Sequence, residues 1–93
     1  MAKPALRRRE GLRMAFKRLS RPKQLALGYI SSAIPIHQTY LVRFGIKVAT
    51  LRGLENDGYA RLLFLSEKEA PHLPMPFWCM TQAGRDLMRA QNL

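Results

Sequence analysis

The chain has 93 residues, of which 16 are lysine or arginine and 6 are aspartate or glutamate, so its formal net charge at pH 7 is +10. A chain of this length builds one modest hydrophobic core, which excludes a large two-domain enzyme with a cleft between its domains. Hydrophobic residues make up 47% of the chain and aromatic residues 9%, as in globular proteins rather than in disordered polycations.

The positive charge is concentrated at the N-terminus. Residues 1–23 contain nine basic residues and one acidic residue, a net charge of +8, while the remaining 70 residues carry only +2. We therefore expect a basic N-terminal arm at residues 1–18, followed by a single domain at residues 19–93. The cations of the arm that we assign to phosphate binding are Arg7, Arg8, Arg9, Arg13, Lys17 and Arg18.

The arm itself has a helical pattern. Leu12, Phe16 and Leu19 recur at i, i+4 and i+7, so a helix over residues 5–19 has one apolar stripe and a broad basic face. Such an arm lies on nucleic acid or on another subunit, or it is a solvated and frayed terminus. An Arg-rich start that is poor in acidic residues is also typical of a mitochondrial presequence, so that alternative stays open.

The next helix is predicted over residues 21–32. Ser20 is a suitable N-cap, and Pro22 fits the first turn because a backbone N–H is not needed there. Pro35 follows the helix and predicts a short extended segment at residues 33–36. The expected inner side chains of this helix are Ala26, Leu27 and Ile30.

Two further helices are predicted on either side of a tight turn. Residues 37–44 form the first, which ends at Gly45, and residues 47–57 form the second, which ends at Gly58. Two helices joined in this way make a helix-turn-helix arrangement. The side chains expected to face inward are Tyr40, Leu41 and Phe44 from the first helix and Ile46, Leu51 and Leu54 from the second.

After Gly58 the pattern changes from helical to extended. Residues 59–65 predict a strand, residues 66–76 a proline-rich loop and residues 77–80 a second strand, so the three segments form a hairpin. Thr81 then caps a final helix that runs to about residue 90, with Leu87 facing inward. The aromatic side chains expected to pack in the core or at the base of the hairpin are Phe64, Phe77 and Trp78.

Three short motifs carry a family resemblance. The segment GIKVATLRGLENDGYARL at residues 45–62 resembles the turn, recognition helix and first wing strand of the small winged helix-turn-helix regulators of bacteria and phages. The segment WCMTQAGRDLM at residues 78–88 is similar to the second wing strand and the T-x-x-G-x-x-L helix that follows it, and the spacing Ser20-x-Pro22-x-Gln24 is similar as well. The resemblance implies an α+β fold with a three-helix core, a β-hairpin wing and a C-terminal helix, preceded by the basic arm or helix.

The sequence departs from this family at two points. Lys47 stands where the family often has a hydroxyl or aspartate cap on the recognition helix, so the cap is weaker but a positive charge is available for a phosphate. The wing carries Glu67 and Glu69 beside Lys68 and His72, so it is less basic than a wing that grips the minor groove. Lys68 and His72 remain the candidate wing contacts.

These features together predict a sequence-preferring protein that binds double-stranded DNA, probes the major groove with the helix at residues 47–57 and grips phosphates with the arm. The candidate DNA-binding residues are Arg43, Lys47, Thr50, Arg52 and Asn56. We expect a bacterial or phage transcriptional regulator, located in the cytoplasm at the nucleoid and able to form a homodimer. A winged-helix protein associated with RNA or the ribosome and a phage-type inhibitor that binds another protein remain the alternatives.

Several other classes are not expected. No nucleophile is paired with a base and no glycine-rich phosphate loop is present, so we do not expect an enzyme. Cys79 is the single cysteine, and neither His37 nor His72 stands near further ligands in the sequence, so we expect no metal and no cofactor. No apolar stretch reaches the length of a membrane span, so no membrane partner is expected.

Overall fold

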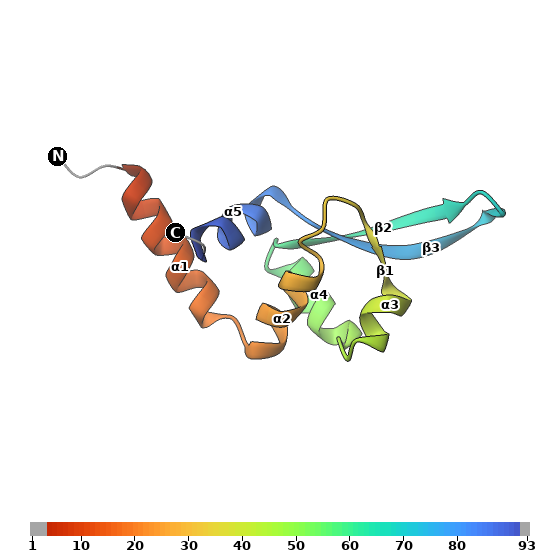
Figure 1. Ribbon diagram of the computed structural model, residues 1–93, viewed down its shortest axis with the longest axis horizontal. Coiled ribbons are helices and arrows are strands. Elements are labelled where there is room, and N and C mark those ends of the chain that lie inside the picture. The colour runs from red at the N-terminus through yellow and green to blue at the C-terminus, as the bar shows by residue number, and fades with distance from the viewer. Residues whose placement is uncertain (1–3, 92–93) are drawn as a thin grey trace.

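The computed structural model describes residues 4–91, which form five α-helices and one three-stranded antiparallel sheet with strand order β1-β3-β2. In chain order the elements are α1 (Pro4–Arg18), α2 (Arg21–Tyr29), β1 (Ile36–His37), α3 (Gln38–Arg43), α4 (Val48–Asn56), β2 (Ala60–Glu67), β3 (Ala70–Met80) and α5 (Gln82–Gln91). The molecule is elongated, with extents of 57 × 23 × 20 Å: α1 and α5 lie at one end, and the β2–β3 hairpin projects from the other (Figure 1). The predicted small α+β fold is confirmed at this level.

One hydrophobic core joins the helices to the inner half of the sheet. Its largest fully buried side chains come from α2, α3, α4, α5 and β3, so each of these elements buries apolar surface against the others. These side chains are Leu27, Ile30, Leu41, Leu51, Leu54, Trp78 and Leu87. The Trp78 indole Nε1 donates a hydrogen bond to the Gln38 side-chain oxygen at 3.0 Å, so the indole N–H is satisfied inside the core.

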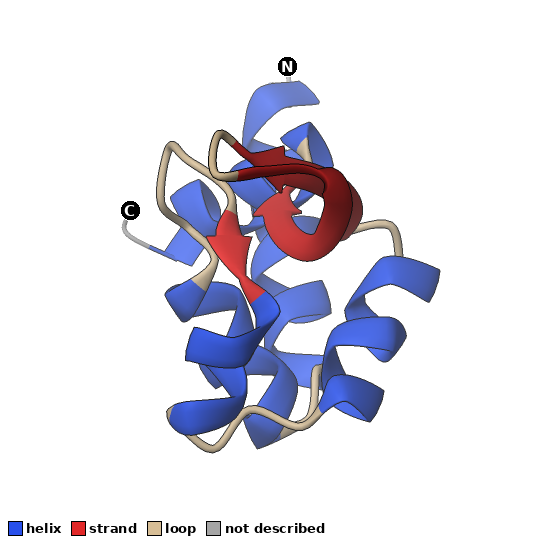
Figure 2. Ribbon diagram, turned by 90° about the vertical axis from the view of Figure 1, so that its right-hand side faces the viewer, coloured by secondary structure: helices blue, strands red, loops and turns tan. Residues whose placement is uncertain are grey.

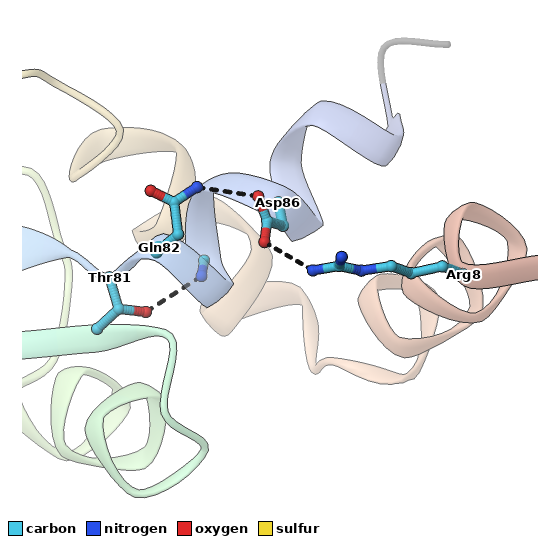
Figure 3. A network of polar contacts seen from close by, with 5 residues as sticks. Arg8, Thr81, Gln82 and Asp86 are labelled. Carbon is cyan, nitrogen blue, oxygen red and sulfur yellow. Dashed lines mark hydrogen bonds and ion pairs between the residues drawn. The ribbon is translucent and has the colours of Figure 1, made fainter. Parts of the chain in front are cut away.

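Helix α1 is part of this body. Its apolar stripe, which includes Leu12 and Phe16, packs against the core, and α1 lies side by side with α5. Two arginines reinforce the contact: the Arg8 guanidinium is 3.2 Å from the Asp86 carboxylate (Figure 3), and Arg13 Nε donates to the Ala90 backbone oxygen at 2.8 Å. The predicted helix is therefore present, and it packs on the body instead of forming a solvated, frayed terminus.

Helix α2 begins as predicted and ends early. The Ser20 hydroxyl accepts a hydrogen bond from the Lys23 backbone N–H at 3.4 Å, which makes Ser20 the N-cap. The helix was expected to reach residue 32 but ends at Tyr29, and the extended segment begins at Ile36 rather than at residue 33. The reason is local: Ile30 lies outside helical geometry as the C-cap, and the Ser31 hydroxyl donates to the Gly28 oxygen at 2.7 Å.

The hairpin differs most from the sequence prediction. Residues 66–76 were expected to form a loop, but β2 continues to Glu67, β3 begins at Ala70, and only Lys68 and Glu69 form the turn. The prolines are tolerated because β1 pairs with β3 only at Phe77 and Trp78, so the outer part of β3 is bonded along one edge alone. Seen end-on in Figure 2, the two strands coil strongly, as two-stranded ribbons do.

Three aromatic side chains do not lie where the sequence placed them. Tyr40 and Phe44 were expected to face inward, and Phe64 to pack in the core or at the base of the hairpin, but they are 57%, 61% and 63% exposed. Helix α3 has only six residues, which is too short for its apolar spacing to define one inner face, and Leu41 alone fills that position. Phe64 shares a sheet face with buried Trp78, but it pairs with Pro76, further out along the hairpin.

Helix α5 follows β3 without a linker. The Thr81 hydroxyl accepts a hydrogen bond from the Gly84 backbone N–H at 3.1 Å (Figure 3). It also donates one to the Gly58 oxygen at 2.6 Å, so the predicted cap ties α5 to the end of α4. Gly84 is buried: a Cβ atom at this position would lie 2.5 Å from the Tyr59 backbone oxygen. Close approach of two backbones explains the glycine in the T-x-x-G-x-x-L pattern.

Candidate nucleic-acid interface

The candidate interface is built on the junction between α3 and α4. Gly45 adopts a φ of +90°, the Ile46 N–H donates to the Leu41 oxygen at 3.0 Å, and the Gly45 N–H donates to the Val42 oxygen at 2.9 Å. This is a Schellman motif, in which buried Ile46 and Leu41 supply the apolar contact that accompanies the bonds. The motif stops α3 and fixes the direction in which the chain enters α4.

Helix α4 buries one side and exposes the other. Leu51 and Leu54 are fully buried, and Ala49, Arg52 and Asn56 are exposed. At about 100° per residue, these three positions lie within about 50° of the direction opposite the two leucines. We call this surface the α4 outer face. It presents a guanidinium and a carboxamide, which are the groups best suited to hydrogen-bond guanine and adenine edges.

Lys47 is the N-cap of α4, as the sequence indicated. Its side chain makes no capping hydrogen bond, and it is exposed. The ammonium group therefore stands at the positive end of the helix, where the first N–H groups of α4 have no side-chain acceptor from their cap. A phosphate oxygen at the start of α4 would lie close to the Lys47 ammonium group and to the first backbone N–H groups of the helix.

Arg52 is exposed but engaged. Its Nη1 atom lies 2.9 Å from a Glu55 carboxylate oxygen, and its Cζ atom lies 6.0 Å from the centroid of the Trp78 ring. Because the pair is solvent-exposed, its strength is small, and the guanidinium can exchange the carboxylate for another acceptor.

Thr50 does not join the α4 outer face. It is half-buried and lines a small cavity of about 210 Å³ between α2 and the junction. Thr50 lies about 70° from the direction of Leu51 and Leu54, so it faces the body rather than the surface that carries Arg52. The cavity is lined by Pro22, Leu25, Tyr29, Phe44, Gly45, Ile46, Lys47 and Thr50. The Tyr29 and Phe44 rings stack there, with centroids 5.1 Å apart.

Gly53 lies beside the end of the Lys23 side chain. A Cβ atom there would lie 2.8 Å from Lys23 Cε, at the flexible end of the lysine. Lys23 Nζ reaches across to the Asp57 carboxylate at 2.8 Å, which joins α2 to the end of α4. Asp57 is thus one half of an interhelical ion pair.

The remaining candidate residues lie on neighbouring elements. Arg43 ends α3, is exposed, and lines a groove of about 480 Å³ that Glu67 and Phe77 also line. Lys68 lies in the hairpin turn and His72 in β3, both exposed at the far end of the molecule (Figure 1). The helix pair and the hairpin therefore present their cations at separate places.

The six arm cations fall into three groups. Arg8 and Arg13 are bonded to α5, as described above. Arg9, Lys17 and Arg18 are exposed on α1, and none has an ion pair among residues 8–91. Arg7 belongs to α1, and its side chain lies outside the described residues.

The sequence alone did not single out Ala49 as a member of the outer face or Gln38 as the partner of Trp78. The outward position of Ala49 could have been predicted, because counting helical positions from Leu51 and Leu54 places residue 49 outward and residue 50 inward. The contact between Gln38 and Trp78 could not, since the two residues are 40 positions apart and meet only through the fold.

Within residues 4–91, no helix is long and apolar enough to span a membrane, and no three His, Cys, Asp or Glu side chains gather where they could hold a metal ion. Comparison with known proteins found no matching family model, no matching curated protein and no matching solved structure.

Proposed function

We propose that this protein is a winged helix-turn-helix regulator that binds double-stranded DNA with a sequence preference, with α4 entering the major groove. One observation carries the proposal. The α4 outer face presents Arg52 and Asn56 on a helix that begins at a free ammonium group, Lys47. An α-helix fits the major groove, and Arg52 in the middle of α4 and Asn56 at its end are side-chain types that hydrogen-bond base edges.

The arrangement of elements supports the same proposal. Helices α3 and α4 flank a four-residue turn, and β2 and β3 follow α4 as a projecting hairpin. In a winged helix-turn-helix these elements serve as the supporting helix, the recognition helix and the wing. Arg43 at the end of α3 is placed for a phosphate beside the groove, and the exposed cations of α1 add attraction without sequence preference.

A selection from random duplexes tests the proposal. We expect a preferred duplex to emerge, and we expect Asn56→Ala to relax its preference at one base pair by about 1–3 kcal/mol. Lys47→Ser should instead weaken every duplex alike and lower the slope of log affinity against log salt by about 1. Fluorescence anisotropy of labelled duplexes over a range of salt concentrations measures both effects. Arg89→Ala, an exposed arginine on α5, is the matched control.

Structured RNA is the necessary competitor. The RNA-associated alternative requires structured RNA to displace the protein from every duplex at moderate salt, which would reject the proposal. Failure of both Asn56→Ala and Lys47→Ser to change duplex binding would reject α4 as the contacting element.

A further inference from the structure

The outer half of the hairpin has two strand edges of different character. Strand β2 is an edge strand of the sheet along its whole length, and β3 is covered by β1 only at Phe77 and Trp78. Unpaired strand edges present backbone N–H and C=O groups that pair readily with another strand. The exposed part of β3 holds Pro71, Pro74 and Pro76, which have no N–H to donate, whereas β2 has no proline.

Strand β2 is also the more regular of the two. Between the pairs Leu65–Met75 and Glu67–Ala70, β2 has one intervening residue and β3 has four, so the extra residues belong to β3. A bulged strand twists away from further pairing, while a regular strand keeps its ladder positions in order. The open edge of the hairpin suited to a further strand is therefore that of β2.

The side chains of β2 form a pattern that is complementary to itself. Phe64 lies at the middle and is 63% exposed, and Leu65 beside it is 40% exposed. Arg61 and Glu67 lie three positions before and three positions after Phe64. Both are exposed, and neither forms an ion pair with any of the described residues.

We propose that β2 pairs antiparallel with β2 of a second copy of this chain, with Phe64 on the two-fold axis. In this register Arg61 stands directly opposite the partner's Glu67, and Glu67 opposite the partner's Arg61, so each dimer contains two cross-strand ion pairs. Leu63 stands opposite the partner's Leu65, and the two three-stranded sheets become one sheet of six strands. A shift of the register by one residue moves the apolar side chains to the other face and separates the charges.

The proposal assigns a role to the open edge of β2, which the proposed contact of α4 with DNA does not use. The exposed centre of β2 is apolar and its ends carry Arg61 and Glu67, so another copy of the same strand matches both. The pairing rests on β2 alone and does not depend on whether α4 binds DNA.

Charge reversal tests the register with the full-length chain. Sedimentation equilibrium of the unmodified protein should show a monomer–dimer equilibrium. Arg61→Glu and Glu67→Arg should each weaken the dimer by about tenfold or more, because each replaces two attractive pairs with two repulsive ones. An equimolar mixture of the two single variants should form a mixed dimer as strong as the original, and the double variant R61E/E67R should dimerise normally.

Phe64→Lys tests the axis. It places two ammonium groups opposite each other and should give a monomer, while Leu73→Lys, at an equally exposed apolar position on β3, should leave the dimer intact. Far-ultraviolet circular dichroism checks that every variant is folded. A monomer at all concentrations of the unmodified protein overturns the proposal. So does a dimer that none of the β2 substitutions weakens, or a mixture of single variants that fails to recover the dimer.

Discussion

At the scale of single residues, Arg52 on the α4 outer face is already engaged within the protein. Its guanidinium lies over the Trp78 ring and meets the Glu55 carboxylate. In the proposed complex this carboxylate would compete with acceptors on DNA for the guanidinium, so Glu55 should limit the duplex affinity of this surface.

This arrangement leads to a prediction for Glu55→Gln. The substitution removes a negative charge from the proposed interface and releases the guanidinium, so duplex affinity should rise by about threefold or more at low salt. Fluorescence anisotropy with the selected duplex measures the change. Glu69→Gln in the hairpin turn removes the same charge far from α4 and should have a smaller effect. Equal gains in duplex affinity for both variants would show that the affinity depends on the net charge of the protein and not on the Arg52–Glu55 pair.

At the scale of elements, local chemistry marks where helices begin and end. Ser20 and Thr81 cap α2 and α5 through their hydroxyl groups, and Gly45 and Gly58 end α3 and α4 with positive φ angles. All four boundaries were predictable because each depends on one residue and its immediate neighbours.

The features that sequence analysis misplaced or missed are of two kinds. The prolines of residues 66–76 predicted a loop, and only the short length of β1 allows them to lie in a strand instead. The α5 partners of Arg8 and Arg13 were likewise not predictable, because they lie 78 and 77 positions away. Thr50 and the Arg52–Glu55 pair were predictable, because helical positions counted from Leu51 and Leu54 turn Thr50 inward, and residues three apart are neighbours on a helix surface.

The α3–α4 junction gives a prediction about stability. Gly45→Ala forces a side chain into the left-handed region and should lower the free energy of unfolding by about 1–2 kcal/mol, although no atom crowds the new Cβ. Gly28→Ala, at an exposed helical position of α2 with equal space, should raise it by about 0.5–1 kcal/mol. Urea unfolding followed by circular dichroism measures both. Equal effects of the two substitutions would contradict the role of the φ angle.

At the scale of the whole molecule, much of the positive charge lies on a helix that packs against the core. Helix α1 uses Leu12 and Phe16 to pack on the core and Arg8 and Arg13 to contact α5, so the exposed cations that remain are carried on a packed helix. Deleting residues 1–18 would remove core packing together with charge, and its effect on DNA binding could not be assigned to either.

Neutralising the exposed cations separates the two effects. The triple variant R9Q/K17Q/R18Q keeps the apolar stripe of α1 and should lower the salt slope of duplex binding by up to about 3, since each neutralised phosphate contributes about 0.9. Its unfolding midpoint should stay close to that of the original protein. Arg13→Gln should do the reverse, with a small change in slope and a lower midpoint. An unchanged slope in the triple variant would remove α1 from the proposed interface.

The pairing of α1 with α5 also bears on how the chain folds during synthesis. Arg8 and Asp86 are 78 positions apart, so the surface that covers the apolar stripe of α1 does not exist until nearly all of the described chain has left the ribosome. Closing so long a loop is slow compared with forming the helices and the hairpin. During that interval α1 is a cationic, amphipathic segment without its packing partner, next to the ribosome's own polyanion. Packing of α1 against α5 therefore covers the exposed apolar stripe of α1 as well as completing the fold.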